Sequence, residues 1–343
     1  MNWWLPHKFE EKRNFLMQRA ALQSAIRTFF TRQGFVEVTT PVLQVCPVMD
    51  AHIHGFATTL KGVDLRDKGT LYLQTSPEFD MKKLLVAGMP RIFQLCPVFR
   101  NAEGSRLHSP EFTMLEWYRT HSDYNDIMQD TIELIRHCAN ALNVGILRHK
   151  DMVCDPFKEV QKLSVNDAFI EMAGIQLDAY LDDTDAFSGA IKAQGIRVAD
   201  DDRWDDLFFR VMAEKIEPYL GMDVPTILYD YPVCMASLSR RKPEDPRFAE
   251  RFELYVCGIE LANAFSELTD AKEQVSRYHQ EMDIKEQLYG ERYPLDEEFI
   301  AALEHGLPES GGIALGVDRL AMLMSGAETI DQVLWTSNFG TKS

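Results

Sequence analysis

The sequence has few cysteines and lacks any long hydrophobic run. Its six cysteines are scattered, and no two of them form a Cys-x-x-Cys pair. A reduced, cytoplasmic setting is the simplest interpretation of that pattern. The apolar runs are far too short to cross a bilayer, and the first residues, MNWWLP, contain no basic region followed by an apolar core. We therefore expect a cytoplasmic protein with no secretion signal and no membrane association.

The sequence also has few basic residues relative to acidic ones. Lysine and arginine together number 36 against 53 aspartates and glutamates, which gives a net charge of −17. Broad binding to nucleic acid depends on neutralising phosphates with Lys and Arg, so this balance argues against it, although a local basic patch can coexist with an acidic whole. The chain has 343 residues, of which 45% are apolar. It can therefore bury a full core as one large domain or two.

Two aromatic and aliphatic segments, residues 92–100 and 111–118, enclose a short polar loop. Their composition predicts a strand, a loop and a second strand. Because side chains alternate between the faces of a strand, Phe112, Met114, Glu116 and Tyr118 should share one face. With Arg100 at the mouth, this face can stack a base, hold an anion and bind a cation at its far end.

A second segment, residues 251–263, predicts a hairpin that carries two carboxylates. If Cys257 and Gly258 form a two-residue turn, Tyr255 pairs with Glu260, and Glu253 lies diagonally across on the same face. Two carboxylates in one space raise each other's pKa unless a cation lies between them, and a hard divalent ion that holds phosphates suits such ligands. An exposed hairpin with two solvated acids is the alternative for this segment alone.

The remaining pattern predicts alternating helices and strands. The expected helices cover residues 9–33, 76–85, 123–142 and 271–289, with a further one near 207–216, and the expected strands cover residues 35–39, 71–74 and 312–317. In the second helix Ser76 is a suitable N-cap, Pro77 suits the first helical position, and Glu78 falls in the first turn. Residues 144–247 are the least informative part of the chain.

Several separate motifs resemble those of class II aminoacyl-tRNA synthetases. The helix and strand that end at Pro41 resemble motif 1. Phe99-Arg100-Asn101, His108 and Pro110-Glu111-Phe112 resemble motif 2, and the sequence GIALGVDR at 312–319 resembles motif 3. Residues 75–78 (TSPE), 114–118 (MLEWY) and 260–271 narrow the resemblance to the lysyl type. Within that type the chain is most similar to the freestanding paralogues of lysyl-tRNA synthetase that modify elongation factor P, from about Arg19 to about Glu328.

The resemblance implies an α+β fold, with a mainly antiparallel sheet flanked by helices, in a homodimer. It implies one catalytic domain over residues 1–343, with motif 1 at about 13–41, motif 2 at about 92–118, a helical insertion at about 150–247 and motif 3 at about 311–325. Motif 1 begins within the first few tens of residues, which leaves no room for the anticodon-binding barrel of lysyl-tRNA synthetases. We therefore expect no anticodon-binding domain and no anticodon recognition.

The resemblance also implies ATP and Mg²⁺ as cofactors. It assigns two catalytic arginines, Arg100 to the α-phosphate and the substrate carboxylate and Arg319 to the γ-phosphate, and both roles suit a guanidinium. It places Phe112 on the adenine, with Arg319 on the opposite side. The metal ligands would be Glu253 and Glu260. The full set of implied ATP contacts is Arg100, Asn101, Ala102, Glu103, His108, Ser109, Phe112, Glu260, Leu261, Gly316 and Arg319.

An extended diamine substrate needs anions at both ends. Glu267 and Tyr118 match the residues that hold the side-chain ammonium in lysyl enzymes, and Glu78, Glu116 and Asn263 match those around the other amino group and the carboxylate. A buried carboxylate paired with an ammonium discriminates strongly, because a neutral ligand would leave it unpaired. The full implied substrate set is Ser76, Pro77, Glu78, Glu116, Tyr118, Asn263, Glu267 and Ala314.

Four positions depart from the usual lysyl pattern. Ala102 replaces a glutamate of motif 2, so either Glu103 takes the adenine-contacting role or the loop relies on backbone contacts. Ser109 replaces an asparagine. Ala264 replaces a glycine, which we expect to add a methyl group beside the pocket. Ala314 also stands where tRNA-charging enzymes have glycine, and its methyl group at the carboxylate end of the substrate would favour a β-amino acid.

The implied reaction is ATP-dependent activation of (R)-β-lysine, or of lysine less well, to the aminoacyl-adenylate. Transfer to the ε-amino group of a lysine of elongation factor P follows. One alternative is a truncated lysyl-type synthetase that charges a tRNA or another acceptor. Another is a non-catalytic binding paralogue, for which Ala102 is the only hint in the sequence. A phosphate-clamping set as complete as this one argues against such decay.

Overall fold

A central sheet organises the computed structural model, which describes residues 3–336. The eight strands of this sheet in the described part are, in spatial order, β1 (Val36–Glu37), β5 (Arg91–Phe99), β6 (Glu111–Thr120), β13 (Ser310–Gly316), β12 (Ile259–Ser266), β11 (Phe248–Val256), β10 (Thr226–Pro232) and β9 (Gln161–Ser164). The outermost pair at each edge is parallel and every other pair is antiparallel. This confirms the predicted α+β class with a mainly antiparallel sheet. The predicted single domain over 1–343 extends at both ends beyond the described residues.

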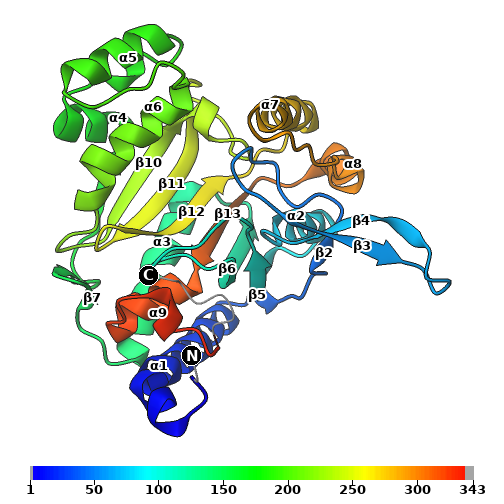
Figure 1. Cartoon of the computed structure of the whole chain (residues 1–343), viewed down its shortest axis with the longest axis vertical. Helices are drawn as coiled ribbons and strands as arrows, with labels where there is room; N and C mark the ends of the chain where they lie inside the picture. Colours follow the sequence, from blue (N-terminus) through cyan, green and yellow to red (C-terminus); the bar gives the residue numbers. More distant parts are fainter. Residues whose placement is uncertain (1–2, 337–343) are drawn as a thin grey trace.

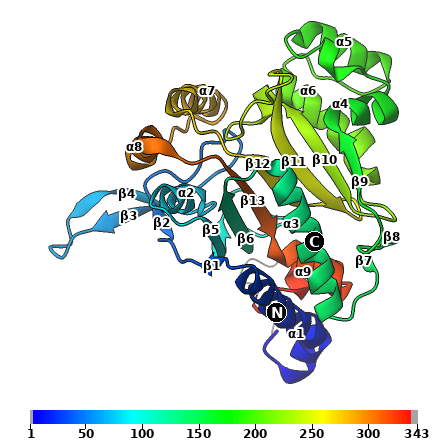
Figure 2. The same cartoon turned by 180° about the vertical axis from the view of Figure 1, so that it is seen from behind.

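Three helices cover one face of this sheet, namely α1 (Pro6–Arg32), α3 (Tyr124–Ala141) and α9 (Val317–Ser325) (Figure 2). On β6, Leu115 and Trp117 point to these helices and are fully buried. The ring of Phe30 on α1 stacks on that of Phe93 on β5, with 4.8 Å between centroids. Each such side chain contributes about 1.5–3 kcal/mol when it is buried. The large apolar core therefore lies on the helical face and leaves the opposite face of the central strands for a site.

The helix boundaries follow from capping. The side chain of Asp123 accepts the N–H groups of Asn125 and Asp126, and Asp126 reaches back to the N–H of Asp123, so α3 begins with a reciprocal cap. The helix α7 (Ala271–Tyr289) begins at a capping aspartate and ends at Gly290, which adopts φ 68°. Both helices match the predicted ranges to within one residue at each end. None of the helices within residues 3–336 combines the length and the apolar character needed to span a bilayer.

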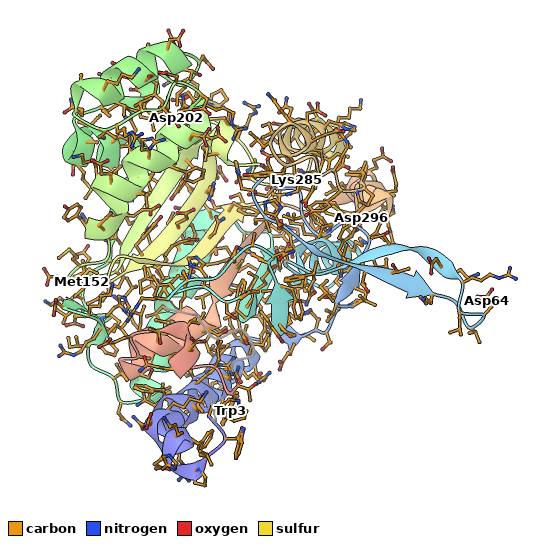
Figure 3. The ribbon with its side chains drawn as sticks, viewed as in Figure 1. Trp3, Asp64, Met152, Asp202, Lys285 and Asp296 are labelled. Atoms are coloured by element: carbon orange, nitrogen blue, oxygen red, sulfur yellow. The ribbon has the colours of Figure 1, made fainter. Side chains whose placement is uncertain are left out.

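A second layer forms around the predicted helix after Ser76. Here α2 (Glu78–Val86) packs with α7 and α8 (Glu297–Gly306), and Phe79 stacks on Phe299 at 4.8 Å between centroids. Beside them, β2 (Leu43–Gln44), β3 (Phe56–Lys61) and β4 (Asp67–Leu73) form a three-stranded sheet. Its β3–β4 hairpin projects away from the body of the molecule (Figure 1), and Asp64 marks its tip in Figure 3.

The segment expected to be a helical insertion, residues 150–247, is only partly helical. It contains β8 (Met152–Cys154), which pairs with β7 (Leu147–His149), and two strands of the central sheet, β9 and β10. The helices of this segment are α4 (Val165–Ala168), α5 (Thr184–Ala193) and α6 (Trp204–Val211), and π-helical turns extend α4 and α6. They form an aromatic core against β9 and β10, in the part marked by Asp202 in Figure 3. Strand β10 is almost completely buried on both faces, so its sequence has no alternation to identify it.

Candidate active site

A cavity of about 230 Å³ lies where the three motif-like segments meet. Its walls come from the loop after β5 and from β6, β12, β13 and α9. Nine of the eleven predicted ATP-binding residues line it, namely Arg100, Glu103, His108, Ser109, Phe112, Glu260, Leu261, Gly316 and Arg319. Asn263 and Ala314, from the predicted substrate set, line it as well. Asn101 and Ala102 do not line it and are exposed. Predicted residues from three distant parts of the sequence thus lie around one cavity.

Arg100 presents a cation with spare hydrogen-bonding capacity. Its Nε is buried and has no hydrogen-bond partner among the described residues, and its nearest carboxylate, that of Glu103, is 3.9 Å away. The guanidinium lies over the ring of Phe112, 5.4 Å from the ring centroid. An unpaired buried donor is costly unless a ligand completes it. An anion bound beside Arg100, such as a phosphate or a carboxylate, would supply that acceptor.

Arg319 lies across the cavity, at the start of α9. One of its nitrogens donates to the backbone carbonyl of Glu260 at 2.8 Å and lies 3.6 Å from the Glu260 carboxylate. A second nitrogen donates to the Nε2 of His108. Burial, helped by the nearby Arg319 charge, lowers the pKa of His108 to about 4. His108 is therefore neutral at pH 7 and can accept a hydrogen bond from Arg319, which orients the guanidinium.

The loop backbone takes a left-handed conformation at Ala102. Ala102 adopts φ 60°, and its backbone N–H is held by the side chain of Asn101 at 2.9 Å. Glu103, the next residue, is the one whose side chain lines the cavity, beside Arg100. Of the two roles considered for this loop, the geometry favours a contact from the Glu103 side chain.

The lysine end of the predicted site is buried beyond the cavity, around Glu116. One carboxylate oxygen of Glu116 accepts the hydroxyl of Ser76 at 2.5 Å, and the other accepts the hydroxyl of Tyr118 at 2.9 Å. Burial, and secondarily the charge of Glu78, raises the pKa of Glu116 to about 8. Ser76 also accepts the N–H of Glu78 at 3.1 Å. The prediction of Ser76 as N-cap was wrong by one residue, because α2 begins at Glu78 with Pro77 as its N-cap.

Glu267 offers the second carboxylate of this pocket. Its Oε2 lies 2.5 Å from the Nζ of Lys82, while its Oε1 is buried without a hydrogen-bond partner among the described residues. Burial raises the pKa of Glu267 to about 8, and Lys82 opposes that rise. Gly312 makes this arrangement possible, because a Cβ there would lie 2.2 Å from Oε1 of Glu267 and 2.3 Å from a ring carbon of Tyr118. An ammonium group would satisfy the free oxygen.

Lys82 is a residue that the sequence reasoning missed. Its Nζ also lies 2.5 Å from Glu78 Oε1, and the side chain is 1% exposed. The signal that could have found it is its position four residues after Glu78, the spacing at which side chains meet on a helix.

The predicted hairpin turn and its pair of Tyr255 with Glu260 are confirmed, and the register shifts beyond them. Cys257 and Gly258 have φ angles of 52° and 69°, as in a type I′ turn, and Tyr255 pairs with Glu260. A bulge between Leu254 and Tyr255 then sets Glu253 opposite Asn263. Glu260 lines the cavity wall while Glu253 is buried, so the alternative of two solvated acids does not hold for Glu253.

Glu253 is held by a set of residues that the sequence did not reveal. Arg251 donates to one of its oxygens at 2.6 Å, and the hydroxyls of Tyr231 and Tyr255 donate to the other at 2.5 and 2.7 Å. Arg251 also donates to Asn263 at 3.0 Å. Its place two residues before Glu253 on the same strand face was the only available signal.

The carboxylates around Glu253 repel one another, as a cation site requires. Burial raises the pKa of Glu217 to about 7, with further contributions from the charges of Glu253 and Glu260. No group of three or more His, Cys, Asp or Glu residues in the described part is arranged to hold a metal ion alone. Glu260 lines the cavity, while both oxygens of Glu253 accept hydrogen bonds from Arg251 and the two tyrosines. A divalent ion held by Glu253 and Glu260 would take its remaining ligands from phosphate oxygens and water.

Two further expectations can be compared with the structure. Ala264, expected beside the pocket, is buried in the apolar core on the helical face of the sheet, so that prediction was wrong. Its neighbours Asn263 and Phe265 face the other side, because side chains alternate along β12. Ala314 does line the cavity, and it pairs in register with both Asn263 and Glu116.

A segment at the rim of the cavity is fastened to α7. Lys285 donates to the backbone carbonyls of Ala51 and Ile53, both at 2.9 Å, and Glu281 accepts the N–H of Ala51 at 3.0 Å. Ile53 lines the cavity, and the next carbonyl, that of His54, accepts the N–H of Asn101 at 2.7 Å. Lys285, labelled in Figure 3, thus connects α7 to the loop that carries Arg100.

Comparison with known proteins shows the family to which the chain belongs. The family described as tRNA synthetases class II (D, K and N) matches residues 2–337. Three curated relatives bear the name elongation factor P–(R)-β-lysine ligase. The one from Pectobacterium carotovorum subsp. carotovorum (strain PC1) is 42% identical over 319 residues, which is 93% of each chain. The one from Histophilus somni (strain 2336) is 40% identical over 320 residues, again 93% of each chain. The one from Vibrio parahaemolyticus serotype O3:K6 is 39% identical over 322 residues, 93% of this chain and 94% of the relative.

Proposed function

We propose, from the premise that the chain belongs to the class II tRNA synthetase family (D, K and N), that it is an ATP-dependent ligase of elongation factor P. It activates (R)-β-lysine, and lysine less well, to the aminoacyl-adenylate and transfers it to a lysine ε-amino group of that factor. The relatives that bear the name of this activity align with 93% of the chain. The observation that carries the proposal is the pair of unpartnered polar atoms, the Nε–H of the Arg100 guanidinium and Oε1 of the Glu267 carboxyl.

The reaction has two steps. A carboxylate oxygen of the amino acid attacks the α-phosphorus of ATP, the bond from that phosphorus to the bridging oxygen breaks, and pyrophosphate leaves. The uncharged amine of the acceptor lysine then attacks the carbonyl carbon of the adenylate. An amide forms, AMP leaves with the bonding electrons, and the amine loses its proton to solvent. Neither step requires a covalent enzyme nucleophile, so the protein acts by positioning and by electrostatic stabilisation.

At the ATP end, Arg100 binds the α-phosphate and the substrate carboxylate, and Arg319, oriented by His108, binds the γ-phosphate. Phe112 stacks on the adenine, and Glu103 contacts it from the loop. Bidentate pairing of guanidinium and phosphate suits both arginines. Mg²⁺ held by Glu253 and Glu260 would neutralise part of the phosphate charge.

At the amino-acid end, Glu267 and Tyr118 bind the side-chain ammonium, and Glu116, Glu78 and Asn263 bind the other amino group and the carboxylate. The side chains of Glu116 and Glu267 are each about 1% exposed, so an uncharged substrate would leave a buried carboxylate without a partner. This requirement favours diamino acids over neutral amino acids of similar length.

We propose a homodimer formed through motif 1. Apolar side chains are exposed along that segment and just after it, namely Met17, Val36, Leu43 and Val45. A second copy that covers them would remove an apolar surface from water. The protein would act as a single catalytic domain in the cytoplasm, without anticodon recognition.

The experiment offers elongation factor P and tRNA in parallel to the purified protein with labelled (R)-β-lysine, ATP and Mg²⁺. Label on the factor, and none on tRNA, is expected. A factor whose acceptor lysine is replaced by arginine should remain unlabelled. Label on tRNA alone would instead establish a truncated synthetase.

Two arginine variants separate catalysis from general effects. Arg319→Met should abolish labelling of the factor. Arg106→Met is the matched control, because Arg106 is on the same loop as His108 but is exposed and pairs only weakly with Glu328, at 3.7 Å. Loss of labelling in both variants would contradict the role given to Arg319.

A further inference from the structure

The lysine end of the site contains a lysine of its own. The Nζ of Lys82 lies 2.5 Å from Oε1 of Glu78 and 2.5 Å from Oε2 of Glu267, the two carboxylates proposed to meet the two ends of the substrate. The ammonium is enclosed by rings, 5.4 Å from the centroid of Phe265 and 5.9 Å from that of Phe299. The side chain of Lys82 is 1% exposed, so it is a fixed part of the pocket wall and does not move out of the pocket when a substrate binds.

The charge of the pocket depends on this residue. In the ionised form that binds a diamino acid, Glu78, Glu116 and Glu267 together carry three negative charges, and Lys82 reduces the sum to minus two. A diamino acid brings two ammonium groups, and its carboxylate is matched separately by Arg100. The pocket with Lys82 is therefore balanced by one bound diamino acid. Without Lys82 one buried carboxylate would keep an uncompensated charge, which a protein interior avoids by taking up a proton.

Lys82 also determines which oxygens remain for the substrate. It occupies one oxygen on each of two carboxylates, Oε1 of Glu78 and Oε2 of Glu267. Oε1 of Glu267 is then left as a buried oxygen without a hydrogen-bond partner in the described part. Because the space between the two carboxylates is filled, a substrate ammonium cannot bridge them. Each substrate nitrogen must bind its own carboxylate, which requires two nitrogens separated by an extended chain.

We propose that Lys82 is the positioning residue that fixes the charge and spacing of the amino-acid pocket, and so restricts it to extended diamino acids. This inference rests on the proposed function, because it takes a lysine-type substrate as given. Lys82 touches neither the cavity that would hold ATP nor the reacting atoms, and it acts through Glu78 and Glu267.

The surroundings of Lys82 allow a test by pH. The titratable groups that contact Lys82 are Glu78 on its own helix and Glu267 after β12, and these two interact in turn with Glu116 and Tyr118 on β6. From α8 it meets only the ring of Phe299, because Asp296 and Glu298 pair with Lys83 instead. An ammonium this close lowers the pKa of a carboxyl by about 1–3. Its removal should therefore change the pH at which the pocket carboxyls ionise.

The experiment measures ATP–pyrophosphate exchange between pH 6 and pH 9.5, with the KM for the amino acid and the KM for ATP determined separately. In Lys82→Met the midpoint of the amino-acid KM profile should move to a pH about 1–3 higher than in the wild type. At pH 7 the KM for the amino acid should rise about tenfold for each pH unit by which the midpoint shifts upward. The KM for ATP should stay within about twofold, since Lys82 lies outside the ATP cavity.

Lys83→Met is the matched control. Lys83 is the next residue on α2 and pairs with Asp80, Asp296 and Glu298, but it does not contact the pocket. Its removal costs ion pairs on the same helix and should leave the midpoint where it is in the wild type. Lys82→Arg keeps the positive charge and should also keep that midpoint close to the wild-type pH, even if its kcat falls.

The outcomes separate the two proposals. Normal wild-type exchange together with an unchanged midpoint in folded Lys82→Met would overturn this inference alone. If Lys82→Met does not fold, the Lys82→Arg variant provides the test. A midpoint displaced from the wild-type pH in Lys82→Arg would also overturn this inference. A wild type with no exchange on any diamino acid would overturn the proposed function, and this inference with it.

Discussion

The guanidinium of Arg19 on α1 and the carboxylate of Asp318 on α9 form a buried ion pair at 2.8 Å, although 299 positions separate them. The other oxygen of Asp318 accepts the N–H of Thr113 on β6 at 2.7 Å, and Arg19 also donates to the hydroxyl of Thr113 at 2.7 Å. These three residues tie the motif 1, motif 2 and motif 3 segments to one another. The pair fixes the start of α9, and therefore the base of Arg319 in the cavity.

Arg19→Met should destabilise the protein by about 3–5 kcal/mol, because it leaves the carboxylate of Asp318 buried without its partner. Burial already raises the pKa of Asp318, and Arg19 opposes that rise. Urea unfolding measures the loss. Arg27→Met on the same helix is the control, because its pair with Glu37 is largely exposed and should be worth about 0–1 kcal/mol. Equal small losses in both variants would contradict a special role for the buried pair.

Gly312→Ala should damage the amino-acid pocket selectively. The added Cβ would lie 2.2 Å from Oε1 of Glu267 and 2.3 Å from Tyr118, so one of these side chains must move. Overpacking of this kind costs about 1–3 kcal/mol. If that cost falls on binding, the KM for the amino acid rises about 5- to 150-fold. The KM for ATP should be unaffected, and Gly189→Ala, on α5 with no atom near the added Cβ, should change neither constant. A rise confined to the KM for ATP would contradict the assignment.

Binding of the amino acid should strengthen as the pH rises toward 8. The pKa values of Glu116 and Glu267 are raised to about 8 in the unliganded protein, so both carboxyls hold protons below that pH. A substrate ammonium needs their ionised forms, and its binding must expel those protons. The KM for lysine should therefore fall between pH 6 and pH 8.5 and rise again as the substrate amine titrates near about pH 10.4. A pH-independent KM would contradict the buried carboxyl pair.

The same groups predict how the stability of the unliganded protein depends on pH. The folded chain holds these protons more tightly than the unfolded chain, in which a glutamate has a pKa near its ordinary value of 4.5. Their contribution to stability is therefore present below pH 4.5 and is lost as the pH rises toward 8. Thermal unfolding should show a smaller loss over this range when lysine is bound, since the ligand ammonium compensates the charges.

Ala314→Gly should shift substrate preference from (R)-β-lysine toward α-lysine. Ala314 lines the cavity opposite Asn263 and Glu116, where the amino group of an α-amino acid would come one carbon nearer to the carboxylate. The measurement is the ratio of kcat/KM values for the two isomers. Ala264→Gly, on the next strand but on the helical face, removes a methyl group outside the cavity and should leave this ratio unchanged. An unchanged ratio in Ala314→Gly would contradict the steric explanation.

Local patterns allowed parts of the structure to be predicted from the sequence. The turn at Cys257-Gly258 determined the pairing of Tyr255 with Glu260, because a two-residue hairpin turn leaves one register. The alternation on β6 separated Leu115 and Trp117 from Glu116 and Tyr118 correctly. Helix α7 has the predicted bounds, since its capping aspartate and its terminal glycine are both visible in the sequence.

The features that could not be predicted correctly from the sequence depend on long-range contacts. Nothing in a single sequence pairs Arg19 with Asp318, and Lys82 and Arg251 look like ordinary surface cations until the fold buries Lys82 fully and Arg251 in part. The strand β10 is hidden because both of its faces are covered. The effect of Ala264 was misjudged, since the bulge and the alternation of β12 that turn it to the core are features of the assembled sheet.

The central claim is that the site adenylates a lysine-type amino acid. ATP–pyrophosphate exchange by the purified protein with Mg²⁺, measured with (R)-β-lysine and α-lysine in parallel, tests it most directly. The account predicts exchange that requires the amino acid, is faster with (R)-β-lysine, and is lost in Arg319→Met. Exchange with α-lysine alone would favour a truncated synthetase, and no exchange with either isomer would contradict the account.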